Sequence, residues 1–145
     1  MMQEIFIRRM QIEDAEAVNM LTGQLGYSID IAQVKCNLEL LLNDDDAAAF
    51  VAVLNNRVIG WMTVAGVITL ESSPYCEIRG LIVDEQLRNK QIGKALIEKT
   101  KQWCRDNKRE RLRVRCNVVR NASHAFYLHL GFKEKKEQKI FEMDV

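Results

Sequence analysis

The stretch from Tyr75 to Cys104 constrains the fold more than any other part of this chain. Residues 78–83 are rich in β-branched side chains and predict a strand, and a polar turn follows them. Apolar positions then recur with the 3.6-residue period of a helix buried on one face, at Ile92, Leu96, Thr100 and Trp103. A strand that leads through a turn into a helix is a building unit of folds that combine helices with a sheet.

The turn before this helix has the composition of an anion-binding site. The first N–H groups of a helix have no partner within the helix, and the helix dipole adds partial positive charge there. Gly93 permits a close approach of the backbone, and Arg88, Lys90 and Lys94 add cations. The pattern favours a diphosphate cradle, and the alternative is an ordinary strand-to-helix connection with surface lysines.

Length and composition predict one globular domain that spans residues 1–145. The chain is 48% apolar and 28% charged, which is typical of a protein with a core. Its net charge of +1 argues against recruitment of nucleic acid or of an acidic membrane. No apolar run approaches the roughly 20 residues of a membrane span. Residues 1–5 lack the features of a signal peptide, so a cytoplasmic location is expected.

The cysteines and histidines do not predict a metal site. None of the four cysteines forms a CxxC pair, and each lies in an apolar periodic segment, so buried reduced thiols are expected. His124 and His129 have no partner at metal-ligand spacing. The run Asp44-Asp45-Asp46 follows a predicted helix and is expected to be a solvated loop.

The order of the remaining segments predicts a fold of the α/β (α+β) class. Tight turns are expected at Asn55-Asn56, and bends or bulges at Gly60 and Gly66. About seven strands are predicted, at 5–10, 47–54, 58–70, 78–83, 112–116, 132–136 and 140–145, the last two forming a closing hairpin. About four helices are predicted, at 14–25, 31–42, 92–104 and 122–130. Hairpins give antiparallel pairs and helical crossovers give parallel ones, so the central sheet is expected to be mixed.

Two separated segments resemble the Gcn5-related N-acetyltransferase (GNAT) family, and the resemblance covers essentially the whole chain. Arg88 to Gly93 is similar to the family's pyrophosphate-binding Gln/Arg-x-x-Gly-x-Gly/Ala motif at a helix start. The segment from Asn117 to Phe132 is similar to the family segment that ends in Phe-Tyr-x-x-x-Gly-Phe. Gln91 departs from the motif, where the family most often has glycine. If that position needs a positive φ, Gln91 costs roughly 1 kcal/mol or more.

Finer spacing resembles one bacterial subgroup of the family. The pattern Asn-x-x-Arg-x-x-x-His-x-Phe-Tyr, which begins at Asn117, is similar to aminoalkylphosphonate N-acetyltransferases and to relatives of aminoglycoside acetyltransferases. Leu25-Gly26-Tyr27 fits the same subgroup. The resemblance therefore implies transfer of an acetyl group from acetyl-CoA to the primary amine of a small molecule.

The resemblance also implies which residues bind acetyl-CoA. Family strands separate near the reacting carbonyl and release backbone N–H donors, which here fall at Leu81 and Val83. Asn117 and Asn121 are expected near the pantetheine arm, with Asn121 as a plain helix cap the alternative. The predicted cofactor-binding residues are Leu81, Ile82, Val83, Arg88, Asn89, Lys90, Gln91, Ile92, Gly93, Lys94, Asn117 and Asn121.

The chemistry of acetyl transfer selects two further residues. Alkyl amines are mostly protonated at pH 7, so a general base must remove a proton, and Glu77 on the central strand is the candidate. At two-residue spacing it is expected to share a face with Arg79 and Leu81, and an ion pair with Arg79 is its alternative role. Tyr127 is the candidate acid toward the CoA sulfur, since a phenol has a basicity similar to that of a thiolate. Its alternative role is that of a core aromatic residue.

The sequence predicts the residues that bind the acceptor amine less clearly than those that bind acetyl-CoA. Tyr27, Arg79, Arg120 and His124 are candidate substrate-binding residues, because the last three offer cations to an anionic acceptor group. The alternative role of Arg120 and His124, which is slightly favoured, is to brace the start of their helix and pair with carboxylates. A protein or peptide N-acetyltransferase and a non-catalytic CoA-binding sensor stay open as alternatives. Three interpretations of the arginines at 111, 113 and 115 stay open: a basic stripe, pairing with acids across the sheet, or a contact in a homodimer.

Overall fold

The computed structural model describes residues 4–145, and of residues 88–90 it describes the backbone only. The chain forms two compact units. The first ends at Val114 and holds a sheet with helices on both faces, and the second runs from Arg115 to Val145. No helix in the described range is both long and apolar enough to cross a membrane.

The first unit is built on a mixed five-stranded sheet with the strand order β1-β2-β3-β4-β5. The strands are β1 (Phe6–Arg9), β2 (Ala47–Leu54), β3 (Arg57–Val67), β4 (Tyr75–Val83) and β5 (Leu112–Val114). The first four pair antiparallel in sequence order, and β5 pairs parallel to β4. The mixed pairing predicted from hairpins and a helical crossover is confirmed.

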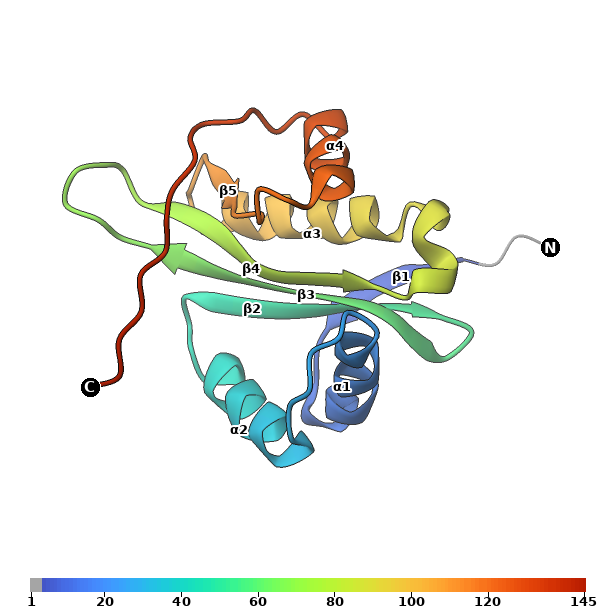
Figure 1. The fold of residues 1–145 in the computed structure, drawn as a ribbon. Coiled ribbons are helices and arrows are strands. Elements are labelled where there is room, and N and C mark those ends of the chain that lie inside the picture. Colours follow the sequence, from blue (N-terminus) through green and yellow to red (C-terminus); the bar gives the residue numbers. More distant parts are fainter. Residues whose placement is uncertain (1–3) are drawn as a thin grey trace. The chain divides into compact units, whose positions relative to one another are not determined.

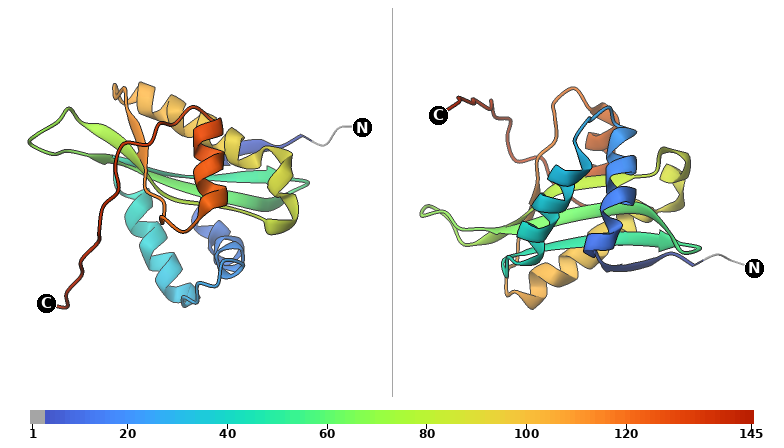
Figure 2. Two further views of the ribbon diagram at one scale, coloured as in Figure 1. Left: turned by 45° about the horizontal axis from the view of Figure 1, so that its top comes forward. Right: turned by 90° about the horizontal axis from the view of Figure 1, so that it is seen from below.

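Helices cover both faces of this sheet (Figures 1 and 2). One face carries α1 (Ala15–Gly23), which follows the 3₁₀ turn η1 (Ile12–Asp14), and α2 (Ile31–Leu42). The other face carries α3 (Ile92–Asp106), which follows the 3₁₀ segment η2 (Glu85–Lys90). The sheet is thus the middle layer of three in this unit.

The core of the first unit lies on both faces of β2, as its uninterrupted apolar sequence predicts. Seven residues of β2 are buried. The core between the sheet and the helices α1 and α2 contains Met10, Ala15, Val18, Leu38, Ala49, Val51 and Val53. On the opposite face, Ile92, Leu96 and Ile97 of α3 are fully buried, so α3 is fixed along the middle of the sheet.

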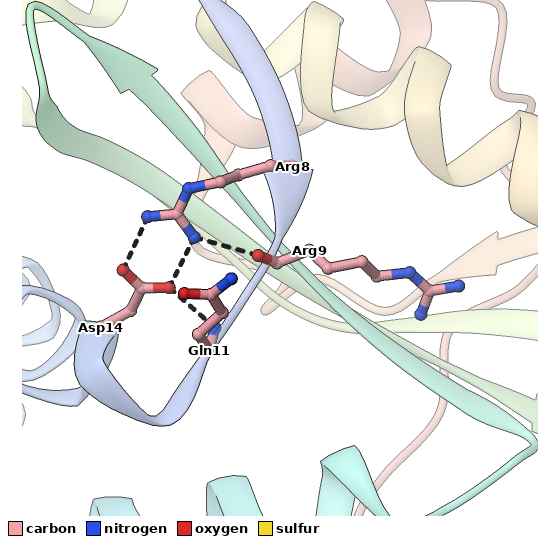
Figure 3. A network of polar contacts seen from close by, with 4 residues as sticks. All are labelled: Arg8, Arg9, Gln11 and Asp14. Atoms are coloured by element: carbon pink, nitrogen blue, oxygen red, sulfur yellow. Dashed lines mark hydrogen bonds and ion pairs between the residues drawn. The ribbon is translucent and has the colours of Figure 1, made fainter.

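A polar network joins β1 to the start of α1 (Figure 3). The guanidinium of Arg8 donates to both carboxylate oxygens of Asp14 at 2.8 and 2.9 Å. The backbone N–H of Gln11 donates to the same carboxylate at 2.7 Å. Burial acts to raise the pKa of Asp14, but the hydrogen bonds from Arg8 and Gln11 and the charge of Arg8 outweigh it and lower the pKa. The charged form of Asp14 therefore stabilises this connection.

Asparagines and a bulge shape the β2–β3 hairpin. Asn55 and Asn56 form its turn with φ angles of 52° and 62°, which confirms the predicted tight turn. Ala52 pairs with Gly60 but the next residue pairs with Val58, so Ile59 is an extra residue of β3. The bulge predicted near Gly60 is therefore present.

Gly66 has a different role from the bend that was predicted for it. A Cβ atom at this position would lie 1.6 Å from the guanidinium of Arg109 and 2.2 Å from the carboxylate of Asp46. These two side chains form an ion pair with a nitrogen–oxygen distance of 2.8 Å. The ion pair lies against the Gly66 Cα, so a larger residue at this position would displace the ends of these two side chains.

The second unit contains α4 (Asn121–His129), and Gly131, two residues after the helix, has a φ of 100°. The prediction of a closing hairpin at 132–136 and 140–145 is wrong, because the chain has no regular secondary structure there. The described sheet accordingly has five strands instead of about seven. Residues 133–139 are dominated by Lys and Glu, which offer few apolar cross-strand pairs, and a hairpin without a covered apolar face is marginal.

The cysteines are free thiols, as predicted, but their burial differs. Cys76 and Cys104 are buried, Cys116 is half-buried, and Cys36 on α2 is exposed, which corrects the prediction for Cys36. Its neighbours Asn37 and Glu39 are exposed as well, because only Leu38 of α2 is deeply buried. Burial raises the pKa of Cys104, and the neighbouring Cys76 adds to the rise. Within the described residues, no group of three or more His, Cys, Asp or Glu side chains could hold a metal ion.

Candidate active site

The connection from β4 to α3 is held by polar contacts at its beginning. The carboxylate of Asp84 accepts from the N–H of Gln86 at 3.1 Å and pairs with the guanidinium of Arg57 at 2.9 Å. The N–H of Glu85 donates to the side-chain oxygen of Gln24, at the end of α1, at 3.0 Å. These contacts fix the backbone of η2, which leads into the helix.

Gln91 has a left-handed backbone conformation, with the positive φ that was considered for this position of the motif. It has φ 61° and ψ 24°, and it lies between η2 and α3 as the residue that follows the first and precedes the second. The N–H of Ala95 donates to the Gln91 carbonyl at 3.1 Å, which is the first hydrogen bond of the helix. The N–H groups of residues 92–94 precede that bond, and the side chain of Gln91 does not cap them. The start of α3 therefore presents N–H groups of the kind that bind an anion.

Of the cations predicted beside this helix start, the structure describes the side chain of Lys94 but not those of Arg88 and Lys90. The side chains of Arg88, Asn89 and Lys90 lie outside the described residues. Lys94 is exposed in the first turn of α3, whereas Ile92 and Gly93 are buried. Burial of Gly93 agrees with the close backbone packing expected of a glycine at this position.

β4 contains a one-residue bulge at Arg79. Val64 of β3 pairs with Ile78, and the preceding residue Thr63 pairs with Gly80, so Arg79 has no opposite residue. Because an extra residue reverses the alternation of side chains, the residues after it lie on opposite faces from those expected.

This bulge corrects one prediction about Glu77. Glu77 lies opposite Ala65 of β3, whereas Leu81 lies opposite Met62. Residues three apart on β3 point to opposite faces, so Glu77 and Leu81 do not share a face.

The backbone N–H groups of β4 also change sides at the bulge. Before it, the N–H of Cys76 donates at 3.0 Å to a carbonyl just ahead of β5. After it, the N–H of Asp84 donates at 2.8 Å to a carbonyl of β3. Backbone N–H groups alternate between the two edges of a regular strand, so those of Cys76 and Asp84, eight residues apart, would normally point to the same edge. They point to opposite edges because of the extra residue. The N–H groups of Leu81 and Val83 therefore point toward the side on which β5 lies.

β5 does not reach these N–H groups. It pairs with β4 only at Cys76, Glu77 and Ile78, while β4 continues to Val83. No strand of the described sheet pairs with β4 on that side beyond Ile78. The bulge and the early end of β5 together leave an open strand edge directly ahead of the start of α3.

Glu77 is a buried carboxylate beside this edge. Its side chain is 2% exposed and forms an ion pair with the half-exposed Arg79 at 2.9 Å. In the β4–β5 pairing Glu77 lies opposite Arg113, which donates to the hydroxyl of Tyr75 at 3.2 Å. The guanidiniums of Arg111 and Arg113 lie over the Tyr75 ring at 4.8 and 4.5 Å. The ion pair of Glu77 with Arg79 that was considered as an alternative role therefore exists.

Trp61 and Gly80 shape the bulge and were not singled out from the sequence. A Cβ atom on Gly80 would lie 2.6 Å from the indole ring of Trp61, so the ring covers this position. The Trp61 indole nitrogen is buried, and it has no hydrogen-bond partner in the described residues. A glycine inside a strand is a sequence signal for a bulge, but the covering ring belongs to another strand.

Tyr127 lies in the second unit, on α4. Its ring makes edge-to-face contacts with Phe126 and Phe132 at centroid distances of 5.3 and 5.6 Å. Burial raises the pKa of Tyr127, the neighbouring Cys116 adds to the rise, and the charge of Arg120 opposes it. The phenol is therefore protonated at neutral pH.

The other predicted residues of this unit gather at the start of α4. The Asn117 side chain accepts from the N–H of Val119 at 3.1 Å, and a ring nitrogen of His124 lies 2.9 Å from the Asn117 carbonyl. Arg120 is the residue before the helix and Asn121 is its first residue, so Asn121 is not the cap. His124 braces the helix start, as its alternative role predicted.

Tyr27 lies between α1 and α2 and is 62% exposed. Two surface hollows of about 140 and 200 Å³ in the first unit share Arg9 and Trp103. Neither is lined by a predicted site residue. The structure thus brings together Glu77, Arg79 and residues 81–94 in the first unit, and Asn117, Arg120, Asn121, His124 and Tyr127 in the second.

Comparison with known proteins identifies the class of this chain. The model of the acetyltransferase (GNAT) family matches residues 14–132. An uncharacterized N-acetyltransferase of Methanocaldococcus jannaschii is 28% identical over 101 residues, which are 68% of this chain and 45% of that protein. Another, from Chlorobaculum tepidum, is 27% identical over 132 residues, which are 91% of this chain and 77% of that protein. The chain spans about half the length of the first of these relatives.

Solved structures share the fold. The aminoglycoside N-acetyltransferase AAC(6')-Iy in complex with CoA matches with a TM-score of 0.89 and 21% identity, over 100% of this chain and 98% of that chain. AAC(6')-Ih from Acinetobacter baumannii matches with a TM-score of 0.85 and 16% identity, over 98% and 99%. By class the protein has the mixed α+β fold that these acetyltransferase structures share. It belongs to the acetyltransferase (GNAT) family, whose cosubstrate is acetyl-CoA.

Proposed function

We propose that this protein transfers the acetyl group of acetyl-CoA directly to the primary amine of a small molecule. The observation that carries the proposal is the bulge at Arg79, which turns the N–H groups of Leu81 and Val83 toward an open strand edge. Directly along the chain, the start of α3 offers further N–H groups. A thioester carbonyl at the open edge and a diphosphate at the helix start would each meet the donors that they need.

In this proposal acetyl-CoA lies along the edge of β4. The N–H of Leu81 or Val83 polarises the thioester carbonyl, the other pairs with the pantetheine arm, and Ile82 lies between them. Residues 88–94 bind the pyrophosphate through backbone N–H groups and cations. Asn117 and Asn121 hydrogen-bond the pantetheine arm. We propose that both units together form one acetyltransferase domain over residues 1–145.

Glu77 acts as the general base and Tyr127 as the general acid. Glu77 takes a proton from the ammonium form of the acceptor, directly or through water, and the neutral amine attacks the thioester carbon. A carbon–nitrogen bond forms, and the carbon–sulfur bond then breaks. The sulfur leaves with its electron pair and takes the proton of the Tyr127 hydroxyl, and the positively charged nitrogen of the new amide returns its surplus proton to the Tyr127 oxygen, directly or through water. In this proposal Arg79, whose guanidinium lies 2.9 Å from the Glu77 carboxylate, orients that carboxylate.

The acceptor is proposed to be a small amine that carries an anionic or hydroxylated group. Arg79 is half-exposed and Arg120 is exposed, so both are available to such a group, with Tyr27 and His124 as further candidates. The solved neighbours that act on aminoglycosides support amines of this size without fixing the acceptor. The cytoplasmic location expected from the sequence stays a prediction.

Two substitutions test the catalytic roles. Tyr127→Phe keeps the aromatic contacts but removes the proton, so we expect kcat to fall about 100-fold with little change in the KM for acetyl-CoA. Glu77→Gln should remove the acidic limb of the pH–rate profile. Initial rates with a panel of amines that includes aminoglycosides and aminoalkylphosphonates would measure both effects. Glu16→Gln removes an exposed carboxylate on α1, away from the proposed site residues, and is the matched control for Glu77→Gln.

The same panel of amines distinguishes an acetyltransferase from a CoA-binding sensor. If the protein binds acetyl-CoA but mass spectrometry finds no acetylated amine, it is a CoA-binding sensor and the proposed reaction is wrong. If kcat is unchanged in Tyr127→Phe, the acid is another group.

A further inference from the structure

The guanidiniums of Arg111 and Arg113 lack an acidic partner. Arg111 donates to the carbonyl of Ser73 at 3.1 Å, and Arg113 donates to the hydroxyl of Tyr75 at 3.2 Å. Both acceptors are uncharged, and no carboxylate in the part of the chain that the structure describes forms an ion pair with either guanidinium. Both arginines are half-buried, so water and salt screen their charges less than on an open surface. Two oriented cations without a counter-charge indicate a site for an anion.

The ring of Tyr75 holds both guanidiniums in position. It is 4% exposed, and the guanidiniums of Arg111 and Arg113 lie 4.8 and 4.5 Å from its centre. Attraction between a cation and an aromatic ring stabilises each guanidinium there. A guanidinium has five N–H donors, so the hydrogen bonds to Ser73 and Tyr75 leave most of them for a ligand. Because the arginines are already oriented, a bound anion would cost little conformational entropy.

These side chains share a face of the sheet with Glu77. Glu77 of β4 lies opposite Arg113 of β5, and paired residues on neighbouring strands project to the same face. Tyr75 is two residues from Glu77, and Arg111 is two residues from Arg113, so both follow onto that face. Neighbouring strands are about 4.8 Å apart. An amine beside the Glu77 carboxylate and an acidic group beside the Arg113 guanidinium can therefore belong to one small molecule.

The balance of charge around Glu77 is positive. The half-exposed Arg79 pairs with Glu77 at 2.9 Å, and Arg111 and Arg113 add two cations on the same two strands. An acceptor with several ammonium groups would bring like charges against these arginines, which disfavours binding. An acceptor that carries an oxyanion as well as its amine would bring the opposite charge. The sign of the local charge therefore favours an acidic acceptor.

We infer that the acceptor is a small molecule with a carboxylate or phosphate a few bonds from its amine. Arg111 and Arg113 bind the oxyanion while the amine meets Glu77. The inference rests on the proposed acetyl transfer and names the substrate class for it. Arginine binds both kinds of oxyanion through parallel N–H donors. An aminoglycoside, the substrate class in the names of the solved neighbours, should be a poor acceptor for this protein.

Matched acceptors test the inference on the natural chain. 2-Aminoethyl phosphate and β-alanine carry the oxyanion, 2-aminoethanol and β-alaninamide are their neutral counterparts, and kanamycin is a polycation. We expect kcat/KM for at least one acidic acceptor to exceed that of its neutral counterpart about 30-fold, with kanamycin below both. The better acid identifies the oxyanion as phosphate or carboxylate. If the neutral amines or kanamycin are acetylated as well as the acids, the inference is wrong although acetyl transfer stands.

Substitution of Arg113 tests its part in this preference. In Arg113→Gln the ratio of kcat/KM between acidic and neutral acceptor should fall about 10-fold or more, through a higher KM for the acid. Arg113→Lys keeps the charge and should retain part of the ratio. Arg105→Gln removes an exposed cation from the last turn of α3 and is the matched control, with an unchanged ratio. A ratio unchanged in Arg113→Gln would contradict the role of Arg113, because a merely structural effect lowers both rates equally.

Binding separates a failure of this inference from a failure of the proposed function. If no amine is acetylated, the proposed function is wrong, and titration calorimetry with the CoA-saturated protein then decides the substrate class. Binding of 2-aminoethyl phosphate or β-alanine about 30-fold more tightly than the neutral counterpart would support the oxyanion site. Equal binding of the acidic and neutral molecules, or binding of none of them, would overturn it.

Discussion

Gln91 holds a backbone conformation that glycine adopts without strain. A left-handed conformation costs a non-glycine residue about 1–2 kcal/mol, while glycine adds entropy to the unfolded chain. We therefore expect Gln91→Gly to raise the free energy of unfolding by about 0.5–1 kcal/mol, measured by urea denaturation. Gln91→Ala keeps a Cβ atom and serves as the control, which should not be stabilised. A Gln91→Gly protein less stable than the natural one would show that the Gln91 side chain makes a compensating contact.

Gly80 is required because the indole ring of Trp61 covers it. Gly80→Ala places a methyl group 2.6 Å from that ring, so we expect a loss of about 1–3 kcal/mol in the free energy of unfolding. Gly23→Ala is the matched control, because Gly23 lies in α1 with nothing within 4 Å of its Cβ position. That variant should gain up to about 1 kcal/mol. Equal effects of the two substitutions would contradict the role of Trp61.

The structural roles of Gln91 and Gly80 could be predicted from the sequence to different extents. Gln91 was identified as irregular because its neighbours resemble a motif with glycine at that place, so local sequence was sufficient. Gly80 depends on a side chain from β3, and the pairing of β3 with β4 is a property of the folded chain. Likewise, Glu77 was correctly assigned to the central strand, but the face of Leu81 was wrong because the bulge at Arg79 was not inferred from the glycine beside it.

At the scale of elements, the connection from β1 to α1 is sensitive to pH (Figure 3). The pKa of Asp14 is lower in the folded protein than its ordinary value of 3.8. Its contribution is therefore complete above the unfolded pKa and is lost as the pH falls through the folded pKa. We expect Asp14→Asn to lose about 1–3 kcal/mol at pH 7, with the difference from the natural protein vanishing in strong acid. Urea denaturation from pH 2 to 7 would measure this.

Glu16→Gln provides the matched control for that series, because Glu16 is exposed on α1. It should follow the natural protein within about 0.5 kcal/mol at every pH. A loss in Asp14→Asn that is the same at pH 2 and pH 7 would mean that the Asp14 charge does not stabilise the connection.

The elements themselves were predicted with unequal success, for a physical reason. β2 is an uninterrupted apolar run and α3 has a clear helical period of apolar residues, and both lie where they were predicted. Their apolar residues are the ones that the fold buries, so the sequence pattern and the structure agree. Residues 132–145 carry the alternation of strands without a partner in the described sheet, so their pattern predicted strands that the chain does not form. Hydrophobic periodicity predicts which face of a segment is buried, but it does not predict which other segment covers that face.

At the scale of the whole molecule, ligand binding tests whether the two units act as one domain. A ligand at 100 times its dissociation constant adds about 2.7 kcal/mol to the folded state, which for a chain of this size raises Tm by about 8 °C. We therefore expect saturating CoA to produce one calorimetric transition shifted by that amount. Pantetheine lacks the diphosphate and should shift Tm less, because it leaves the start of α3 empty. Two transitions, of which only one responds to CoA, would contradict a single domain over residues 1–145, and equal shifts by both ligands would contradict the diphosphate site at α3.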